Sequence, residues 1–495
     1  MKNDTGYIRS RAVSLTGFAT KTVAFGLAAL LLASCSDLGG EQENPSLTSS
    51  WVRPEDPQEA IGAKEHPNVL ATYGGVYENE KVERLVAVIV GKLVAVSDDP
   101  SRVYKITLLD TPKVNAFALP GGFLYLTRGL LALANDSSEL AAVIAHEMAH
   151  VTANHAIIRQ ERLSSNAIAE EVVSDVLEDS SAGKVALAAN RIRLSQFSQN
   201  QELQADTIGI RMTGKAGYDP YAASRFLETM EGYRRFLSGS PTTLDADSIV
   251  SNHPPTPTRV RYAIRHARNF GGPGFGERAR ERYLDGIDGI LFGDSSEEGF
   301  VRGRVFSHAG LGIRFEVPEG FRISNEPKAV MISGPGDLLT QFDATVLSKR
   351  TDLKEYLQSG WVKGLVSETI REEKLNGLNA ISAVARGEGF RFKIQLLRKG
   401  NQVYRFVTAA PQTNTNLDAV SRRITESFKL LSKYEVSQLK PHVIRIVTVK
   451  ESDSVRSIAS TMGVSSNKEA LFRMINGMKP DSTVLAGEKV KIVAE

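Results

Sequence analysis

The sequence predicts an α+β protein with a mainly helical first domain that carries a small sheet, a small α/β domain and a short βααβ unit. The chain has 495 residues, too many for one compact core at about 150 residues per domain. Its 42% hydrophobic and 24% charged residues are typical of domains that fold in water. A long helical pattern lies in the first half, whereas alternating strand-like runs lie further on.

The charge balance gives no sign of a nucleic-acid partner. Sixty basic residues face 57 acidic ones, which leaves a net charge of +3. The sequence contains no long Lys/Arg block that could neutralise several phosphates together. We therefore expect no nucleic-acid binding.

The N-terminus predicts export. A basic opening with Lys2, Arg9, Arg11 and Lys21 precedes an apolar run at 23–33. This run is too short to span a bilayer. The layout is typical of a signal peptide, which we place at 1–34.

The apolar run closes on Leu32-Ala33-Ser34-Cys35, which resembles the lipobox of bacterial lipoproteins, where the cysteine is acylated and becomes the new N-terminus. Cys35 is the only cysteine, so the chain has no internal disulfide, and acylation would cap an otherwise exposed thiol. By the sorting rules of such lipoproteins, Ser36 favours a lipid anchor in the outer membrane of a Gram-negative bacterium, with the protein in the periplasm. A buried cysteine behind an uncleaved segment is the alternative.

Composition divides the rest of the chain. We expect an acylated cysteine and flexible tether at 35–57, a first domain at 58–270, a linker at 271–300, a second domain at 301–435 and a last unit at 443–495. Runs at 311–317 and 403–409 predict strands of the second domain, and 353–365 predicts a helix. We assign this second domain no activity.

The first domain carries the pattern HExxH as His146-Glu147-Met148-Ala149-His150. On a helix, positions i and i+4 share one face, so both imidazoles can bind one Zn²⁺. Glu147 then lies beside the metal and can accept a proton from a zinc-bound water. A histidine pair on the core face of an ordinary helix is the alternative.

The surroundings of this motif favour the required helix. Asp136 and Glu139 form a plausible capping pair, and 140–159 contains no Gly or Pro. A catalytic zinc needs a third protein ligand. A third histidine ten residues after the first would fall on Ala156, so we interpret His155, one position out of register, as structural.

A better third ligand is Glu202, which on a helix shares a face with Ala205, Asp206 and Gly209. Small residues on this face would let the helix approach the HExxH helix closely. Asp206 would then hydrogen-bond the outer nitrogen of a ligand histidine and fix its orientation. A solvated acidic helix face is the alternative.

Several motifs in order make 58–270 similar to the gluzincin family that contains the CAAX prenyl endoprotease, the bacterial heat-shock membrane protease and the periplasmic β-barrel-assembly-enhancing protease. The motifs are Asn115-Ala116-Phe117-Ala118, Pro120-Gly121-Gly122, Thr127-Arg128-Gly129-Leu130, HExxH, Glu202 to Asp206, and His253-Pro254 with Arg259. The resemblance implies a zincin-type endopeptidase fold with one zinc, the ligands His146, His150 and Glu202, and Glu147 as general base. No 18-residue apolar stretch interrupts this region, as in the soluble periplasmic members.

Two further features gain meaning from such a site. Runs at 114–119 and 123–126 predict a hairpin, and its second strand, with Gly122, Phe123, Leu124 and Tyr125, could be a sheet edge to which an extended substrate adds. Alternatively, both strands only pack the domain.

His253 could reach the metal site, either as a hydrogen-bond donor to the oxyanion or as a blocking ligand in a resting state. A surface-loop histidine is the alternative. We interpret Arg259 as a structural ion-pair partner.

The last unit resembles a LysM module, a βααβ unit that binds N-acetylglucosamine glycans, through Thr448-Val449-Lys450, Asp453-Ser454, Ser457-Ile458-Ala459, Asn476-Gly477 and Leu485-Ala486-Gly487-Glu488. Ser452 and Ala486 depart from the usual Gly and Pro. The resemblance therefore supports the fold more than binding to peptidoglycan, and a structural cap is the alternative.

The leading hypothesis is a zinc metalloendopeptidase that cuts unfolded or misassembled envelope proteins. A peptidase of peptidoglycan cross-links and a wall-tethered scaffold without activity are the alternatives.

Overall fold

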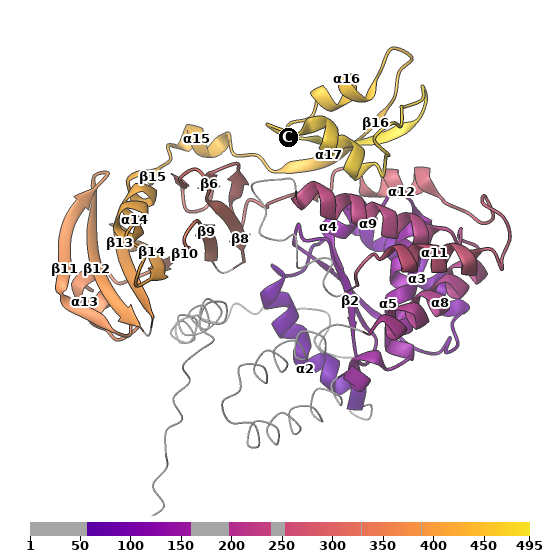
Figure 1. Cartoon of the computed structure of the whole chain (residues 1–495), viewed down its shortest axis with the longest axis horizontal. Coiled ribbons are helices and arrows are strands. Elements are labelled where there is room, and N and C mark those ends of the chain that lie inside the picture. The colour runs from indigo at the N-terminus through magenta and orange to yellow at the C-terminus, as the bar shows by residue number, and fades with distance from the viewer. Residues whose placement is uncertain (1–56, 160–197, 239–252, 328, 388) are drawn as a thin grey trace, which may run out of the picture. The chain divides into compact units, whose positions relative to one another are not determined.

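The computed structural model describes residues 57–159, 198–238 and 253–495, except positions 328 and 388 (Figure 1). The predicted signal peptide at 1–34, Cys35, Ser36 and almost all of the tether lie outside the described residues. Within the described ranges, no helix has both the length and the apolar character needed to cross a membrane.

The described residues form two compact units, both of which mix helices and strands. The larger unit comprises 57–330 and 429–495, and the smaller one comprises 331–428. The smaller unit is therefore shorter at both ends than the predicted 301–435 domain. Residues before and after it form their own sheet in the larger unit, in the order β15-β7-β6-β5. These strands are β5 (Phe300–Arg302), β6 (Val305–His308), β7 (Ile313–Glu316) and β15 (Lys429–Leu430).

The larger unit begins with α2 (Pro57–Thr72) and α3 (Glu80–Ala95), followed by a sheet of β1 (Lys105–Leu109), β2 (Ala116–Leu119) and β3 (Phe123–Thr127). The remaining helices of its first part are α4 (Arg128–Leu133), α5 (Ser137–Thr152), α8 (Gln199–Lys215), α9 (Ala222–Ser238), α11 (Pro257–Ala267) and α12 (Arg280–Ile287). Helix α5 packs on both α8 and α9, and Figure 1 shows these helices together beside the sheet.

The predicted hairpin is confirmed, but its second strand is not a sheet edge. Strands β2 and β3 pair antiparallel, with Phe117 opposite Tyr125. However, β3 also pairs parallel with β1, so the sheet order is β1-β3-β2. The prediction of an edge strand containing Gly122, Phe123, Leu124 and Tyr125 is therefore wrong. All residues of β3 are buried, and a continuous apolar run such as 123–126 is typical of a strand that is buried on both faces.

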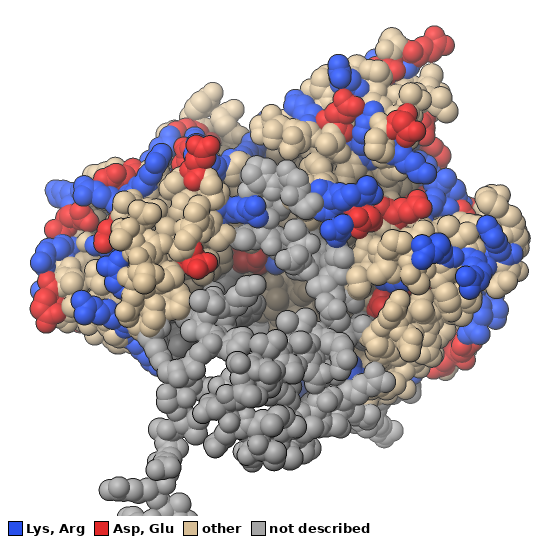
Figure 2. All heavy atoms as spheres, viewed as in Figure 1, with Lys and Arg blue, Asp and Glu red and all other residues tan. Residues whose placement is uncertain are grey.

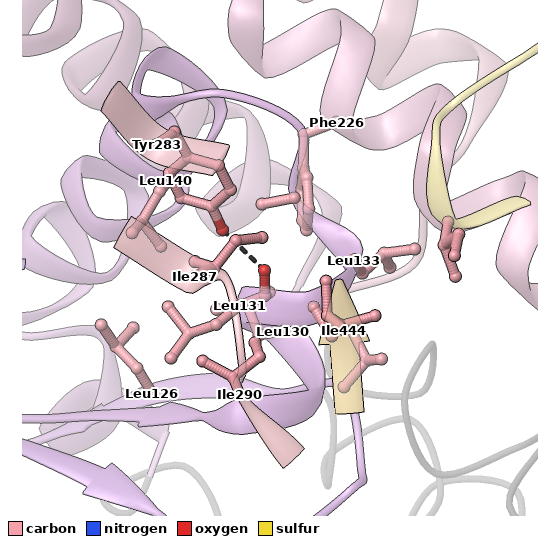
Figure 3. Packing of buried hydrophobic residues seen from close by; sticks show 14 of the residues in the cluster. Leu126, Leu130, Leu131, Leu133, Leu140, Phe226, Tyr283, Ile287, Ile290 and Ile444 are labelled. Atoms are coloured by element: carbon pink, nitrogen blue, oxygen red, sulfur yellow. Dashed lines mark hydrogen bonds between the residues drawn. The ribbon is translucent and has the colours of Figure 1, made fainter. Parts of the chain in front are cut away.

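The predicted linker at 271–300 is wrong from residue 280 on, because this part contains α12 and the short strand β4 (Leu291–Phe292), which packs against the core. Tyr283, Leu284 and Ile287 of α12 are fully buried, whereas its charged residues Glu281, Arg282 and Asp285 are exposed. Tyr283 donates a hydrogen bond of 2.7 Å to Leu131 O in α4. Figure 3 shows this bond within a cluster formed by β3, α4, α5, α9, α12 and Ile444.

Ile444 belongs to the C-terminal unit, which we define as 442–495. Its elements follow the predicted order: β16 (His442–Thr448), α16 (Val455–Ser460), α17 (Lys468–Ile475) and β17 (Lys489–Ala494). Strand β16 pairs with β17 and also with β4 (Leu291–Phe292). The C-terminal unit thus shares its sheet and its core with the first part of the larger unit.

The smaller unit is built on antiparallel strands in the order β11-β12-β13-β14-β10. These strands are β10 (Leu338–Val346), β11 (Leu365–Leu375), β12 (Leu378–Gly387), β13 (Phe390–Lys399) and β14 (Gln402–Pro411), accompanied by α13 (Leu353–Gln358) and α14 (Leu417–Glu426). The predicted helix at 353–365 is too long. Gly360 and Gly364 have positive φ angles of 98° and 71°, which end the helix and lead into β11.

Candidate metal centre

Helix α5 carries the HExxH motif and begins where the sequence predicts. The Asp136 side chain accepts a hydrogen bond of 2.9 Å from the Glu139 backbone N–H, which caps the helix. The Glu139 carboxylate accepts instead from the Asn135 N–H, at 2.9 Å. The helix ends at Thr152, because Asn154 adopts a left-handed backbone with φ of 53°. Residues 155–159 are helical again after this break.

Helix α8 packs directly against α5, as its small residues predict. It begins with a reciprocal capping box between Ser198 and Gln201. A Cβ atom on Gly209 would lie 3.0 Å from His146 N and 3.2 Å from Ala145 C. Since real Cβ contacts are seldom so short, glycine allows the two backbones to approach closely.

This packing brings four side chains together. One ligand atom each from His146, His150, Glu202 and His253 lies within 4.8 Å of the others. His146 Nε2 is 3.0 Å from His150 Nε2, and Glu202 lies 3.6 Å from both of these atoms. His253 Nδ1 lies 2.9 Å from Glu202 Oε1.

The donor set fits a zinc ion. Two imidazoles and one carboxylate on neighbouring helices are ligands that zinc prefers. Glu202 Oε2 is buried and makes no hydrogen bond among the described residues, although Arg259 Nη1 lies 2.7 Å away. The Arg259 guanidinium compensates the charge of this carboxylate, whose oxygens also face the Nε2 atoms of His146 and His150.

Neighbouring side chains hold the candidate ligands in place. Asp206 Oδ1 lies 3.0 Å from His146 Nδ1, the contact that the sequence predicts for Asp206. Arg259 donates two hydrogen bonds to the Asp206 carboxylate, of 2.7 and 2.8 Å. His155 is 1% exposed, and its Nδ1 lies 3.1 Å from His150 Nδ1. The sequence did not predict that His155 contacts and orients His150. This contact depends on the break after α5, which changes the direction of the chain before His155.

The groups of the site have pKa shifts of opposite direction. Burial alone would lower the pKa of His146, but its contacts with Asp206 and Glu202 raise it to about 10. Burial alone would raise the pKa of Glu202, but His146 and His253 hold it well below its usual range. Burial and the neighbouring His146 lower the pKa of His150. These two shifts favour an ionised Glu202 and a neutral His150, the forms that bind metal. Burial raises the pKa of Glu147, which makes its carboxylate a stronger proton acceptor.

Two cavities flank Glu147 and His253 along strand β2. The apolar pocket, of about 70 Å³, is lined at the start of β2 by 114–116 and on its other sides by side chains such as Val143, Leu227 and Met230. The second cavity, of about 280 Å³, follows the rest of β2 and includes Phe117 and Tyr73. Because β3 is its only partner in the described part of the sheet, β2 presents an edge beside the site.

The helix pair, the HExxH motif and the glutamate from the second helix are features of HExxH metallopeptidases of the gluzincin type. Residues 77–267 match the model of peptidase family M48. Over these residues the chain is similar to members of that family.

Similar proteins include three with curated names. The β-barrel assembly-enhancing protease of Yersinia pestis is 26% identical over 341 residues, covering 63% of this chain and 67% of that protein. The protein of the same name from Escherichia coli K12 is 31% identical over 188 residues, covering 36% and 37%. The mitochondrial metalloendopeptidase OMA1 of Schizosaccharomyces pombe is 29% identical over 178 residues, covering 36% and 50%. The chain thus spans little more than a third of the Escherichia coli protein.

Proposed function

We propose that the chain is a zinc metalloendopeptidase of the bacterial envelope, with His146, His150 and Glu202 as zinc ligands and Glu147 as general base. The convergence of His146 Nε2, His150 Nε2 and the Glu202 carboxylate from two packed helices carries this proposal. The match to peptidase family M48 supports it independently.

Zinc bound by these residues would act as a Lewis acid toward the scissile carbonyl and would lower the pKa of a bound water to about 7. The Glu147 carboxylate takes the proton of the attacking water and delivers it to the leaving amine. Its burial supports this role, because burial raises its pKa. Asp206 and Arg259 keep His146 in one orientation.

His253 has two possible roles in this proposal. Its Nε2 lies 3.7 Å from Glu147 Oε1, from where a small rotation would let it donate a hydrogen bond to the oxyanion. Its Nδ1 is close to Glu202, so the same side chain could also be a blocking ligand. Substitution of His253 separates the two roles: loss of activity indicates the donor, and gain of activity indicates the block.

An extended polypeptide fits the edge of β2. Backbone hydrogen bonds to β2 would hold the substrate with little dependence on its sequence. In the antiparallel orientation, the more stable pairing, the part before the cleaved bond lies along the second cavity. The part after the bond then lies at the apolar pocket. Unfolded or misassembled envelope proteins present such segments, and the names of the bacterial relatives agree with this substrate class.

The N-terminal sequence supports a proposal for where the protein is located in the cell. We propose export by the signal peptide at 1–34, acylation of Cys35 and a lipid anchor in the outer membrane, with the enzyme in the periplasm. The βααβ order of the C-terminal unit supports a LysM-like module that contacts peptidoglycan. A peptidase of peptidoglycan cross-links is therefore the second candidate, and release of soluble muropeptides from purified sacculi would distinguish it.

The test uses the full chain with Glu147→Gln. We expect this variant to retain one zinc per chain by metal analysis but to lose cleavage of an unfolded protein. Glu80→Gln is the matched control, because the Glu80 side chain is 79% exposed on α3. Cleavage by Glu147→Gln at the rate of the control would remove Glu147 from the mechanism. Cleavage that persists after complete removal of zinc would contradict the proposal that the protein is a metalloenzyme.

A further inference from the structure

A large groove lies next to the candidate active site. It has a volume of about 1580 Å³ and lies between α9, the start of α11, and α17 with the loop that follows it. Leu227 lines both this groove and the apolar pocket beside Glu147. Pro254 and Pro255, which line the groove, directly follow His253 in the chain. A chain that leaves the apolar pocket past Leu227 therefore enters the groove.

Basic residues outnumber acidic ones in the lining of the groove. Its described lining contains eight basic and four acidic residues: Arg225, Arg234, Arg235, Arg261, Arg278, Arg280, Arg473 and Lys479, against Glu139, Glu228, Glu231 and Asp481. This excess of four positive charges exceeds the net charge of +3 of the whole chain. Figure 2 shows Lys and Arg side chains gathered where α9 passes below the C-terminal unit.

Part of this positive charge has no internal counterion. Within the described residues, no carboxylate lies within 4.0 Å of the cationic groups of Arg261, Arg280 or Lys479. The other basic lining residues are paired: Arg234 and Arg235 with Glu231, Arg225 with Asp219, Arg278 with Asp136, and Arg473 with Glu469. Arg280 donates to the carbonyl oxygens of Asn135 and Lys489. Arg261 and Lys479 are exposed, so an anionic ligand can reach them.

We propose that this groove binds an acidic stretch of the polypeptide substrate, on the C-terminal side of the cleaved bond. The inference rests on the proposed peptidase function and on antiparallel addition of the substrate to β2. In that orientation the substrate passes the start of β2, fills the apolar pocket and continues past Leu227. Guanidinium groups recognise carboxylates through paired hydrogen bonds. Several such groups in one concave surface also speed the capture of an acidic chain.

Three fluorogenic peptides with the same apolar cleavage sequence test this proposal. The first carries four acidic residues after the cleavage site, the second carries them before it, and the third carries four Ser residues after it. At low salt we expect kcat/KM of the first peptide to exceed that of the third by about tenfold, mainly through KM. This ratio should approach one at high salt. The second peptide should show no advantage.

The double variant Arg261→Glu, Lys479→Glu should abolish the ratio between the first and third peptides. Lys450→Glu is the control, because Lys450 is exposed in the same C-terminal unit and does not line the groove. This control should keep the ratio. Since the ratio is taken within each variant, a general loss of activity does not imitate the expected result.

Binding separates this proposal from the peptidase function. The labelled acidic peptide should bind the full-length Glu147→Gln variant more tightly than the Ser peptide does, by fluorescence anisotropy. If no peptide is cleaved but the acidic peptide still binds more tightly than the Ser peptide, the peptidase proposal fails and the proposal that the groove binds acidic polypeptide is retained. The groove proposal is overturned if the Ser peptide is cleaved equally well, if both acidic placements act alike, or if the double variant keeps the ratio. Tighter, competing binding of duplex DNA would also overturn it.

Discussion

Lys491 Nζ lies 2.8 Å from Ala132 O, although the two residues are 359 positions apart. Lys491 is fully buried and also donates to Leu133 O and Ala134 O, at 3.1 and 2.8 Å. The last strand of the chain thus satisfies carbonyl groups at the end of α4, where a helix leaves them without partners. Asp136, which starts the HExxH helix, follows directly.

Replacement of Lys491 should destabilise the larger unit. Lys491→Met removes the side-chain donor of the buried Ala132 and Ala134 carbonyl groups, whereas Leu133 O still accepts a hydrogen bond of 3.2 Å from Asn135 Nδ2. We expect the free energy of unfolding to fall by about 2–4 kcal/mol. Urea unfolding of the full chain measures the effect, with Lys450→Met as an exposed control. An unchanged unfolding midpoint would show that the contact contributes no stability.

Close packing of α8 on α5 should be sensitive to one methyl group. In Gly209→Ala the new Cβ would lie 3.0 Å from His146 N, so α8 must move and carry Glu202 away from the histidines. We expect weaker zinc binding, measured by competition with a chelator. The control is Gly91→Ala on α3, where a Cβ meets nothing within 4 Å; there the substitution should preserve zinc affinity and raise stability by about 0.5–1 kcal/mol. Equal zinc affinity in both variants would contradict the interpretation.

Asp206 should tune metal affinity without binding the metal. In Asp206→Asn the carboxylate 3.0 Å from His146 Nδ1 is lost, and zinc affinity should fall about 10- to 100-fold. Asp98→Asn is a suitable control, because Asp98 pairs with Arg211 of α8 on the surface. If Asp206→Asn binds zinc like this control, the contact has no role in the site.

Glu139 should make stability depend on pH. Burial and the neighbouring Asp136 raise its pKa from 4.5 to about 7, so the folded protein holds this proton more tightly than the unfolded chain does. The resulting stabilisation is complete below the unfolded pKa and is lost as pH rises through about 7. The slope should not exceed about 1.4 kcal/mol per pH unit. In Glu139→Gln, the unfolding free energy should fall less steeply between pH 5 and 7.5, and the slope should change by at most about 1.4 kcal/mol per pH unit. An unchanged slope would show that Glu139 does not cause the pH dependence.

Much of the site could be predicted from local sequence. The spacing of His146 and His150 places them on one face of any helix, and Asp136 can cap only a helix that begins directly after it. The same periodicity gathers Glu202, Asp206 and Gly209 on one face of α8. These features depend on backbone geometry within a few residues, which the sequence specifies directly.

The errors concern neighbours that are distant in sequence. Strand β3 is central because β1 pairs along its other side, and 271–300 is part of the core because the buried face of α12 meets α4. The charged residues of α12 led to the prediction of a linker. A short amphipathic helix contains few apolar residues, so its sequence resembles that of a charged linker.

The sequence by itself determined the HExxH helix, its cap, the second helix with its small and acidic face, and the β2–β3 hairpin. Only the tertiary structure decided which strand is exposed, that His253 and His155 meet the histidine pair, and that the C-terminal unit completes the core. The physical reason is that helical periodicity and turns arise within a few residues. Which surfaces are buried against each other depends instead on the packing of segments hundreds of residues apart, which no local pattern encodes.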